Sequence, residues 1–183
     1  MQHHGTQPIT TSRLLLRQFT LSDAKPMFSG WAGNPKVTRY VTWNCHRSVQ
    51  ETKGLLEQWI KAYQDPSFYE WAIVENASGR LIGSIGAAVQ GDSSACEIGY
   101  CIAPRFWNQG FATEACRAVI AYLFGCGMQS IDALHDIRNP SSGRVMQKCG
   151  MLYRGDRSAY LPAKQETVSC HYYEILKEGD PHR

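Results

Sequence analysis

Residues 97–115 read EIGYCIAPRFWNQGFATEA and place a strand, a tight loop and a helix in immediate succession. The strand is predicted over 95–102 and the helix over about 112–124, where apolar residues fit one broad helical face. Such a loop turns free backbone N–H groups toward solvent at a helix N-terminus. These donors and the helix dipole favour an anion, such as a pyrophosphate.

Gly110 is the residue of this loop that permits backbone angles which other residues resist, and it leaves room for a phosphate. Ala112 keeps the first helical turn slim, and Thr113 can add a hydroxyl donor. The loop lacks the Gly-Lys-Ser/Thr of a Walker loop and the glycine spacing of a dinucleotide fingerprint. An ordinary strand-to-helix turn, in which glycine serves geometry alone, is the alternative interpretation.

The rest of the chain alternates in the same way between strand and helix patterns. Ser48 and Glu51 form a capping-box pattern before a helical run that Asp65 and Pro66 end. Because a strand–helix–strand unit is right-handed and parallel, strands 95–102 and 130–136 should lie parallel. The other predicted strands are at 14–19, 69–74, 81–89, 151–155 and 167–176, and a short helix is predicted at 141–149. We therefore expect an α/β (α+β) fold with one mixed sheet and helices on both faces.

The composition fits one globular domain without nucleic-acid or membrane partners. Of the 183 residues, 43% are hydrophobic and 19% charged, which excludes a disordered chain. The net charge of +3 comes from scattered Lys and Arg, so no stripe for nucleic acid is present. No secretory leader or membrane-length apolar stretch is visible, which predicts a cytoplasmic protein. We expect an N-terminal extension at 1–12, a domain at 13–177 and a C-terminal tail at 178–183.

Seven cysteines argue for reduced thiols rather than for a disulfide framework or a metal site. Their number is odd, their spacing is irregular, and no Cys-x-x-Cys pair occurs. They are Cys45, Cys96, Cys101, Cys116, Cys126, Cys149 and Cys170.

Residues 97–115 resemble motif A of the GCN5-related N-acetyltransferases (GNAT), especially the branch that acetylates ribosomal proteins. That branch often has Gly-Tyr, a few apolar residues, Pro, and then Trp-x-x-Gly-Phe/Tyr-Ala-Thr-Glu-Ala. A second match, NPSSGRVMQKCGM at residues 139–151, is similar to the family pattern Asn-x-x-Ser followed by Lys-x-Gly-Phe. TSRLLLR at residues 11–17 also resembles this branch. The matches span most of the chain in the correct order.

The resemblance implies a mostly antiparallel twisted sheet of about seven strands, whose central parallel pair splays to admit the pantetheine arm of acetyl-CoA. Cys101, Ile102 and Ala103 would lie near the arm, and Asn139 would hydrogen-bond it. Trp107 stands where the wider superfamily places Gln or Arg, so phosphate binding would rest on backbone amides. The residues of the pyrophosphate loop would be Asn108, Gln109, Gly110, Phe111, Ala112 and Thr113.

The implied chemistry is transfer of an acetyl group to a primary amine by direct attack in a ternary complex. Ser142 stands where related enzymes place the donor of a proton to the leaving thiolate, although a helix-capping hydroxyl is the alternative. Glu97, on the strand beside the cofactor, is the first candidate for the general base. The alternative is that Glu97 only faces solvent and has no role in the reaction. His135 is the second candidate for the general base, and the alternative is a structural residue held by hydrogen bonds.

The sequence says least about the acceptor of the acetyl group, because the segments expected to bind it have the least distinct sequence pattern. The acceptor is a protein N-terminus or a small molecule, and its specificity is expected in residues 35–47, where Trp43 lines the pocket, and 153–168. Residues 157–161 lack the carboxylate that some relatives carry there, which leaves a non-catalytic acyl-CoA sensor as an alternative function. The protein is expected as a monomer or a homodimer.

Overall fold

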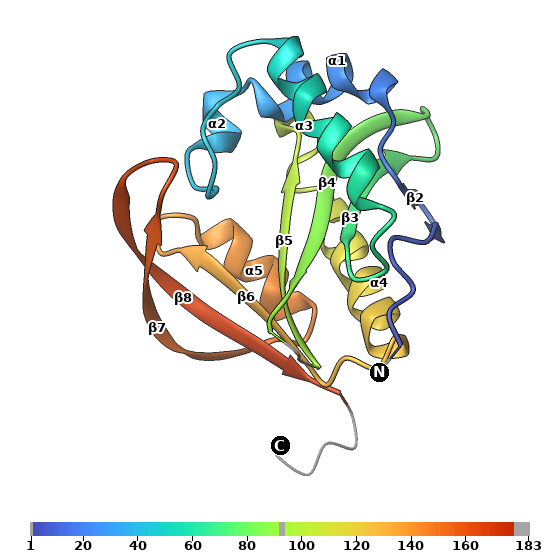
Figure 1. The fold of residues 1–183 in the computed structure, drawn as a ribbon. Helices are drawn as coiled ribbons and strands as arrows, with labels where there is room; N and C mark the ends of the chain where they lie inside the picture. The colour runs from blue at the N-terminus through green and yellow to red at the C-terminus, as the bar shows by residue number, and fades with distance from the viewer. Residues whose placement is uncertain (1, 92–93, 178–183) are drawn as a thin grey trace.

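The computed structural model describes residues 2–91 and 94–177, so the predicted C-terminal tail at 178–183 lies outside the described residues. One sheet runs through the molecule with the strand order β1-β2-β3-β4-β5-β6-β8-β7 (Figure 1). β5 and β6 form a parallel pair and the other neighbouring strands are antiparallel, as predicted. The strands are β1 Ile9–Thr10, β2 Leu14–Arg17, β3 Tyr69–Glu75, β4 Arg80–Val89, β5 Ala95–Ile102, β6 Ser130–Asp136, β7 Leu152–Leu161 and β8 Glu166–Leu176.

Three strands differ from the prediction, one of which is β2, which ends at Arg17 instead of at residue 19. The sheet has eight strands, because the two residues of β1 pair with Leu15 and Leu16 at its edge. β7 runs to Leu161 instead of ending at Gly155, where a register shift lets the strand continue. Gly155 has a φ of 121°, which side chains rarely allow, so a bulge forms there instead of a strand end.

Helices cover both faces of the sheet (Figure 1). Side chains of β5 alternate between the two faces, so Ile98 and Ile102 pack with α4 while Cys101 and Ala103 pack with the N-terminal helices. α4 and α5 share one core cluster, and α1 and α3 contribute to the other. The α-helices are α1 Ala24–Met27, α2 Pro35–Thr38, α3 Val49–Ala62, α4 Phe111–Gly125 and α5 Pro140–Lys148. Within the described part of the chain, no helix is long and apolar enough to cross a membrane.

The helix α3 begins with the predicted cap, with one change. The Ser48 side chain accepts a hydrogen bond from the backbone N–H of Glu51 at 3.2 Å. The Glu51 carboxylate accepts from the N–H of Arg47 at 2.7 Å, one residue before the cap itself. Two N–H groups near the helix start are thus satisfied by side chains.

The parallel pair at the centre of the sheet is short. β5 and β6 pair only from Ala95 to Glu97 and from Ser130 to Asp132. Beyond these residues β5 continues to Ile102 and β6 to Asp136 without a shared ladder. The expected splay is therefore present, and it leaves main-chain groups of both strands facing a gap.

Candidate active site

The gap between β5 and β6 presents backbone groups that could pair with an extended ligand. The N–H of Ala103 donates to the carbonyl of Ile82 on β4 at 2.8 Å. Because partners alternate along an antiparallel strand, the N–H groups of Tyr100 and Ile102 point the other way, into the gap. The carbonyl of Ile102 accepts from Nε1 of Trp107 at 2.6 Å, which fixes the end of the strand.

The three residues predicted beside the pantetheine arm point their backbone N–H groups in different directions. Ile102 turns its N–H toward the gap, whereas Cys101 and Ala103 face β4 with their backbone N–H groups. Cys101 lies in the wall of the cleft described below. Its thiol is 3.3 Å from the hydroxyl of Ser84, and burial raises its pKa to about 11, so it stays a protonated thiol at neutral pH.

The loop before α4 has the backbone of an anion site. Gly110 is the residue before the helix, with a φ of 82°, and Asn108 is also left-handed with a φ of 59°. The amides of the first helical residues, Phe111 to Thr113, have no carbonyl of their own helix to bind. With the positive end of the helix dipole, they suit a pyrophosphate.

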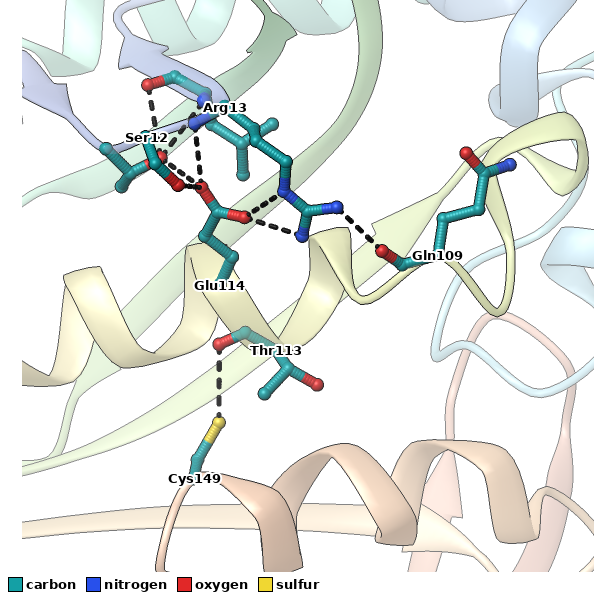
Figure 2. Close-up of polar contacts among 8 residues, drawn as sticks. Ser12, Arg13, Gln109, Thr113, Glu114 and Cys149 are labelled. Carbon is teal, nitrogen blue, oxygen red and sulfur yellow. Dashed lines mark hydrogen bonds and ion pairs between the residues drawn. The ribbon is translucent and has the colours of Figure 1, made fainter.

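A segment from the N-terminus fixes this loop in place (Figure 2). The Glu114 carboxylate accepts from the hydroxyls of Thr11 and Ser12 at 2.6 and 3.1 Å, and from Nε of Arg13 at 2.6 Å. Arg13 also donates to the carbonyl of Gln109 at 2.9 Å. Burial tends to raise the pKa of Glu114, but the hydrogen bonds outweigh it and lower the pKa. Glu114 is therefore an anchor as well as a first-turn acid.

The residues predicted for the pyrophosphate form the end of the loop and the first residues of α4, and the side chains of Gln109 and Phe111 serve the fold. Gln109 donates its side-chain amide to the carbonyl of Arg105 at 2.9 Å. Phe111 is buried in the main core. The carbonyl of Thr113 accepts from the thiol of Cys149, the C-terminal cap residue of α5 (Figure 2). The loop thus has its backbone amides, rather than these side chains, to offer a phosphate.

Ser142, in the first turn of α5, is bonded to Tyr100 across the gap. Its hydroxyl donates to the Tyr100 phenol at 3.1 Å, and the phenol donates to the Ser142 carbonyl at 2.8 Å. The side chain of Asn139, the cap residue of α5, makes no cap hydrogen bond, and the Ser142 hydroxyl bonds to the phenol instead of the helix backbone. Burial raises the pKa of Tyr100 strongly and keeps the phenol protonated. Sequence reasoning missed this partner, although Tyr100 stands within the quoted motif.

A cleft of about 770 Å³ joins the gap to the face of the sheet that α1 and α3 cover. It brings together four predicted site residues, Glu97, Cys101, Asn139 and Ser142, and also His135. The loop at 108–113 does not line the cleft and lies at the start of α4.

The two candidate bases differ in their surroundings. Glu97 lies on β5 with its side chain accessible at the cleft, and partial loss of hydration there, together with the charge of Asp132, raises its pKa. His135 is buried, and Nδ1 lies 2.8 Å from the carbonyl of Asp136. Burial lowers the pKa of His135, and a Cβ at Gly143 would collide with Nε2, which is enclosed. The accessible carboxylate is the better placed of the two.

Glu70 is a cleft residue that sequence reasoning missed. It lies on β3 with its side chain in the cleft wall, and burial raises its pKa to about 8. The signal was present in the sequence, because Glu70 is a charged residue between Tyr69 and Trp71, in a strand that stays apolar from Trp71 to Val74. Trp43, predicted beside an acceptor, also lines the cleft.

Comparisons with known proteins agree with this geometry. A model of the acetyltransferase (GNAT) domain matches residues 13–152. The uncharacterized N-acetyltransferase YoaA of Bacillus subtilis is 31% identical over 171 residues, which cover 92% of this chain and 96% of the relative.

Solved structures share the fold. A putative ribosomal-protein-serine acetyltransferase from Vibrio cholerae aligns with a TM-score of 0.82 at 20% identity, covering 97% of this chain and 100% of that one. The microcin C7 self-immunity acetyltransferase MccE, solved with acetyl-CoA and AMP, aligns with a TM-score of 0.80 at 15% identity, covering 91% of this chain and 94% of that one. The expected resemblance, including ribosomal-protein acetyltransferases among the neighbours, is confirmed. With a family model over most of its length and a relative of matching extent, the chain belongs to the GNAT acetyltransferases, whose acetyl donor is acetyl-CoA.

Proposed function

We propose that this enzyme transfers the acetyl group of acetyl-CoA to a primary amine that enters the cleft from the face covered by α1 and α3. The observation that carries the proposal is that the gap between β5 and β6 opens into the cleft that holds both Glu97 and Ser142. Donor and acceptor can therefore meet in one ternary complex. A reaction between two bound substrates gains from their fixed orientation.

The residues of the chain fit the donor along its length. The amides at the start of α4 would bind the pyrophosphate, with Gly110 giving close access. The N–H groups of Tyr100 and Ile102 would pair with the pantetheine arm as a neighbouring strand does. Asn139, in the cleft wall, would hydrogen-bond the same arm. The bound donor supplies a thioester, whose carbonyl carbon accepts the amine.

Two side chains would move or hold protons. Glu97 takes a proton from the acceptor ammonium, directly or through water, so that the nitrogen gains the free pair it needs to attack. The raised pKa of Glu97 makes its carboxylate a stronger base than an ordinary one. The Ser142 hydroxyl turns from the Tyr100 phenol to the sulfur and gives its proton to the leaving thiolate. In return it takes the second proton, which the nitrogen loses as the amide forms, and Glu97 releases its own proton to solvent. Amide and free CoA are the products.

The acceptor can be a protein N-terminus or a small amine, and one assay separates turnover from mere binding. Acetyl-CoA is incubated with the protein and a panel of N-terminal peptides and small amines, and free CoA is measured. We expect CoA release that depends on the acceptor. Calorimetric binding of acetyl-CoA without such release over the whole panel would favour the sensor function instead. Absence of acetyl-CoA binding would contradict both functions.

A further inference from the structure

Glu70 lies over a strip of sheet that has no side chains. It pairs with Gly86 on β4, and Gly86 pairs with Gly99 on β5. A Cβ at Gly86 would collide with the Glu70 carboxylate, so the carboxylate rests directly on the backbone of β4. Glu97 stands two residues before Gly99 and therefore on the same face. Two carboxylates thus flank a glycine floor in the cleft.

The lining of the cleft is acidic, although the chain has a net charge of +3. Glu70, Glu97 and Asp65 line the cleft, and none of the described lining residues is Lys or Arg. Two histidines, His46 and His135, also line it, but burial lowers the pKa of both and favours the neutral form. A cleft with one sign of charge concentrates ligands of the opposite sign. Asp65, whose pKa is lowered, supplies negative charge, and Glu70 adds to it once a cation displaces its proton, so the cleft favours cations.

Aromatic rings form the walls above this floor. Such rings can pack against the apolar or aromatic part of a ligand, and their faces also attract a cation. The aromatic lining residues include Trp31, Tyr40, Trp43, Trp59 and Phe68.

We propose that Glu70 determines acceptor specificity by binding the ammonium group of the acceptor, which is a cationic amine with an apolar or aromatic body and no carboxylate beside the amine. This assignment rests on the proposed function, because it names the acceptor class of the same cleft. A carboxylate next to the amine would face Glu70 and Glu97 and be repelled.

Ionisation of Glu70 is coupled to this binding. Burial raises its pKa to about 8, while a hydrogen bond from Ser84 acts in the opposite direction. An ammonium group bound to the Glu70 carboxylate favours the charged form of the carboxylate. The acceptor thus provides the stabilisation of this charge that water cannot provide at a buried site. A neutral or anionic acceptor brings no such compensation.

The test measures binding without turnover, by tryptophan fluorescence of the protein saturated with CoA. The ligands are phenylalanine amide and phenylalanine, which differ in the carboxylate. We expect the wild type to bind the amide at least about tenfold more tightly, and Glu70→Gln to weaken amide binding by about tenfold or more. Glu70→Asp, which keeps the charge, should recover part of the loss. The matched control Glu57→Gln lies on α3 beside Lys53, outside the cleft, and should bind as the wild type does.

Three results would overturn the assignment. They are equal binding of the two ligands by the wild type, no binding of either, or unchanged amide affinity in a Glu70→Gln variant whose circular dichroism shows it folded. Failure of the proposed function looks different. In that case the wild type binds the amide through Glu70, yet releases no CoA from acetyl-CoA in its presence.

Discussion

Gly110 has backbone angles that a side chain resists, and it precedes the amides that we assign to the pyrophosphate. Gly110→Glu adds backbone strain, crowding against the Arg13 guanidinium and a negative charge. We expect the Kd for acetyl-CoA, measured by calorimetry, to rise by at least about tenfold.

Gly79 offers the matched control for this substitution. It has a φ of 65° in the turn between β3 and β4, with open space around its Cβ position. Gly79→Glu therefore adds similar strain and the same charge outside residues 108–113. If both variants fold and lose affinity equally, or neither does, the loop assignment is wrong.

Ser142 is bonded to a phenol rather than to the helix backbone, which points to a role in the reaction. We expect Ser142→Ala to lower kcat by about 10²-fold while the Kd for acetyl-CoA changes little, because the thiolate loses its donor. Stopped-flow kinetics and calorimetry measure the two quantities. Ser141→Ala, whose hydroxyl accepts from Arg144, is the control and should keep its kcat. An unchanged kcat in both variants would remove Ser142 from the mechanism.

Because of Glu70, the free energy of unfolding should decrease as pH rises. Its pKa in the folded protein is about 8, against an ordinary value of 4.5, so between these values the unfolded chain is ionised while the folded chain keeps the proton. The unfolded state then binds fewer protons, and the free energy of unfolding decreases as pH rises. Cys101 and Tyr63 lie beside Glu70, but burial raises the pKa of both and keeps them protonated in this range.

The substitution Glu70→Gln should remove this decrease in stability with rising pH, because glutamine does not ionise. We expect the difference in Tm, variant minus wild type, to grow from pH 5 to pH 8 in the absence of ligands. Thermal unfolding followed by circular dichroism measures it, and Glu57→Gln should show a difference that is independent of pH. A Glu70→Gln difference that is flat or shrinks with pH contradicts the raised pKa.

Helix α5 depends on close contact with β6. Gly143 lies in this helix against Nε2 of His135, and a Cβ there would collide with the ring. We expect Gly143→Ala to cost about 1–3 kcal/mol of unfolding free energy, as overpacking does. It should also lower kcat, since Ser142 is the preceding residue and must shift with the helix.

Gly125→Ala is the control for α5, because Gly125 ends α4 in open space. There alanine favours the helix and should stabilise by up to about 1 kcal/mol. Urea unfolding compares the two variants. Equal stabilisation by both would show that α5 does not need the contact with His135.

Local sequence patterns predicted most helices and strands, and the exceptions depend on pairing between strands. β5 and β6 have the predicted bounds, and α4 and α5 agree within a residue. β1 escaped prediction because a strand of two residues exists only through its pairing with β2. β7 is largely exposed and lacks an apolar alternation, so its length follows from the partner β8.

The rim of the cleft joins parts of the chain more than a hundred residues apart. Nζ of Lys164, in the turn between β7 and β8, donates to the carbonyls of Thr38 and Arg39 at 2.8 and 3.0 Å. Asn44 donates to the carbonyl of Ala163 at 2.6 Å. These bonds connect the two segments, 35–47 and 153–168, in which acceptor specificity is expected.

Lys164→Ala should loosen this rim without unfolding the protein. We expect the KM for the acceptor to rise by about fivefold, with the Kd for acetyl-CoA unchanged and stability within about 1 kcal/mol of the wild type. Lys25→Ala, exposed on α1, is the control for charge. Equal kinetics in the two variants would show that the rim does not position the acceptor.

Periodicity, loop chemistry and the two linked motifs were enough to predict the mixed sheet, the splayed pair and the acetyl-CoA-dependent family, because these depend on residues close in sequence. The acidic cleft could not be predicted in this way. Glu70 on β3 and Glu97 on β5 line one cleft, with Gly86 and Gly99 between them, and Tyr100 bonds to Ser142 across the gap. Such pairs depend on sheet register and helix packing, which bring together side chains that local patterns do not relate.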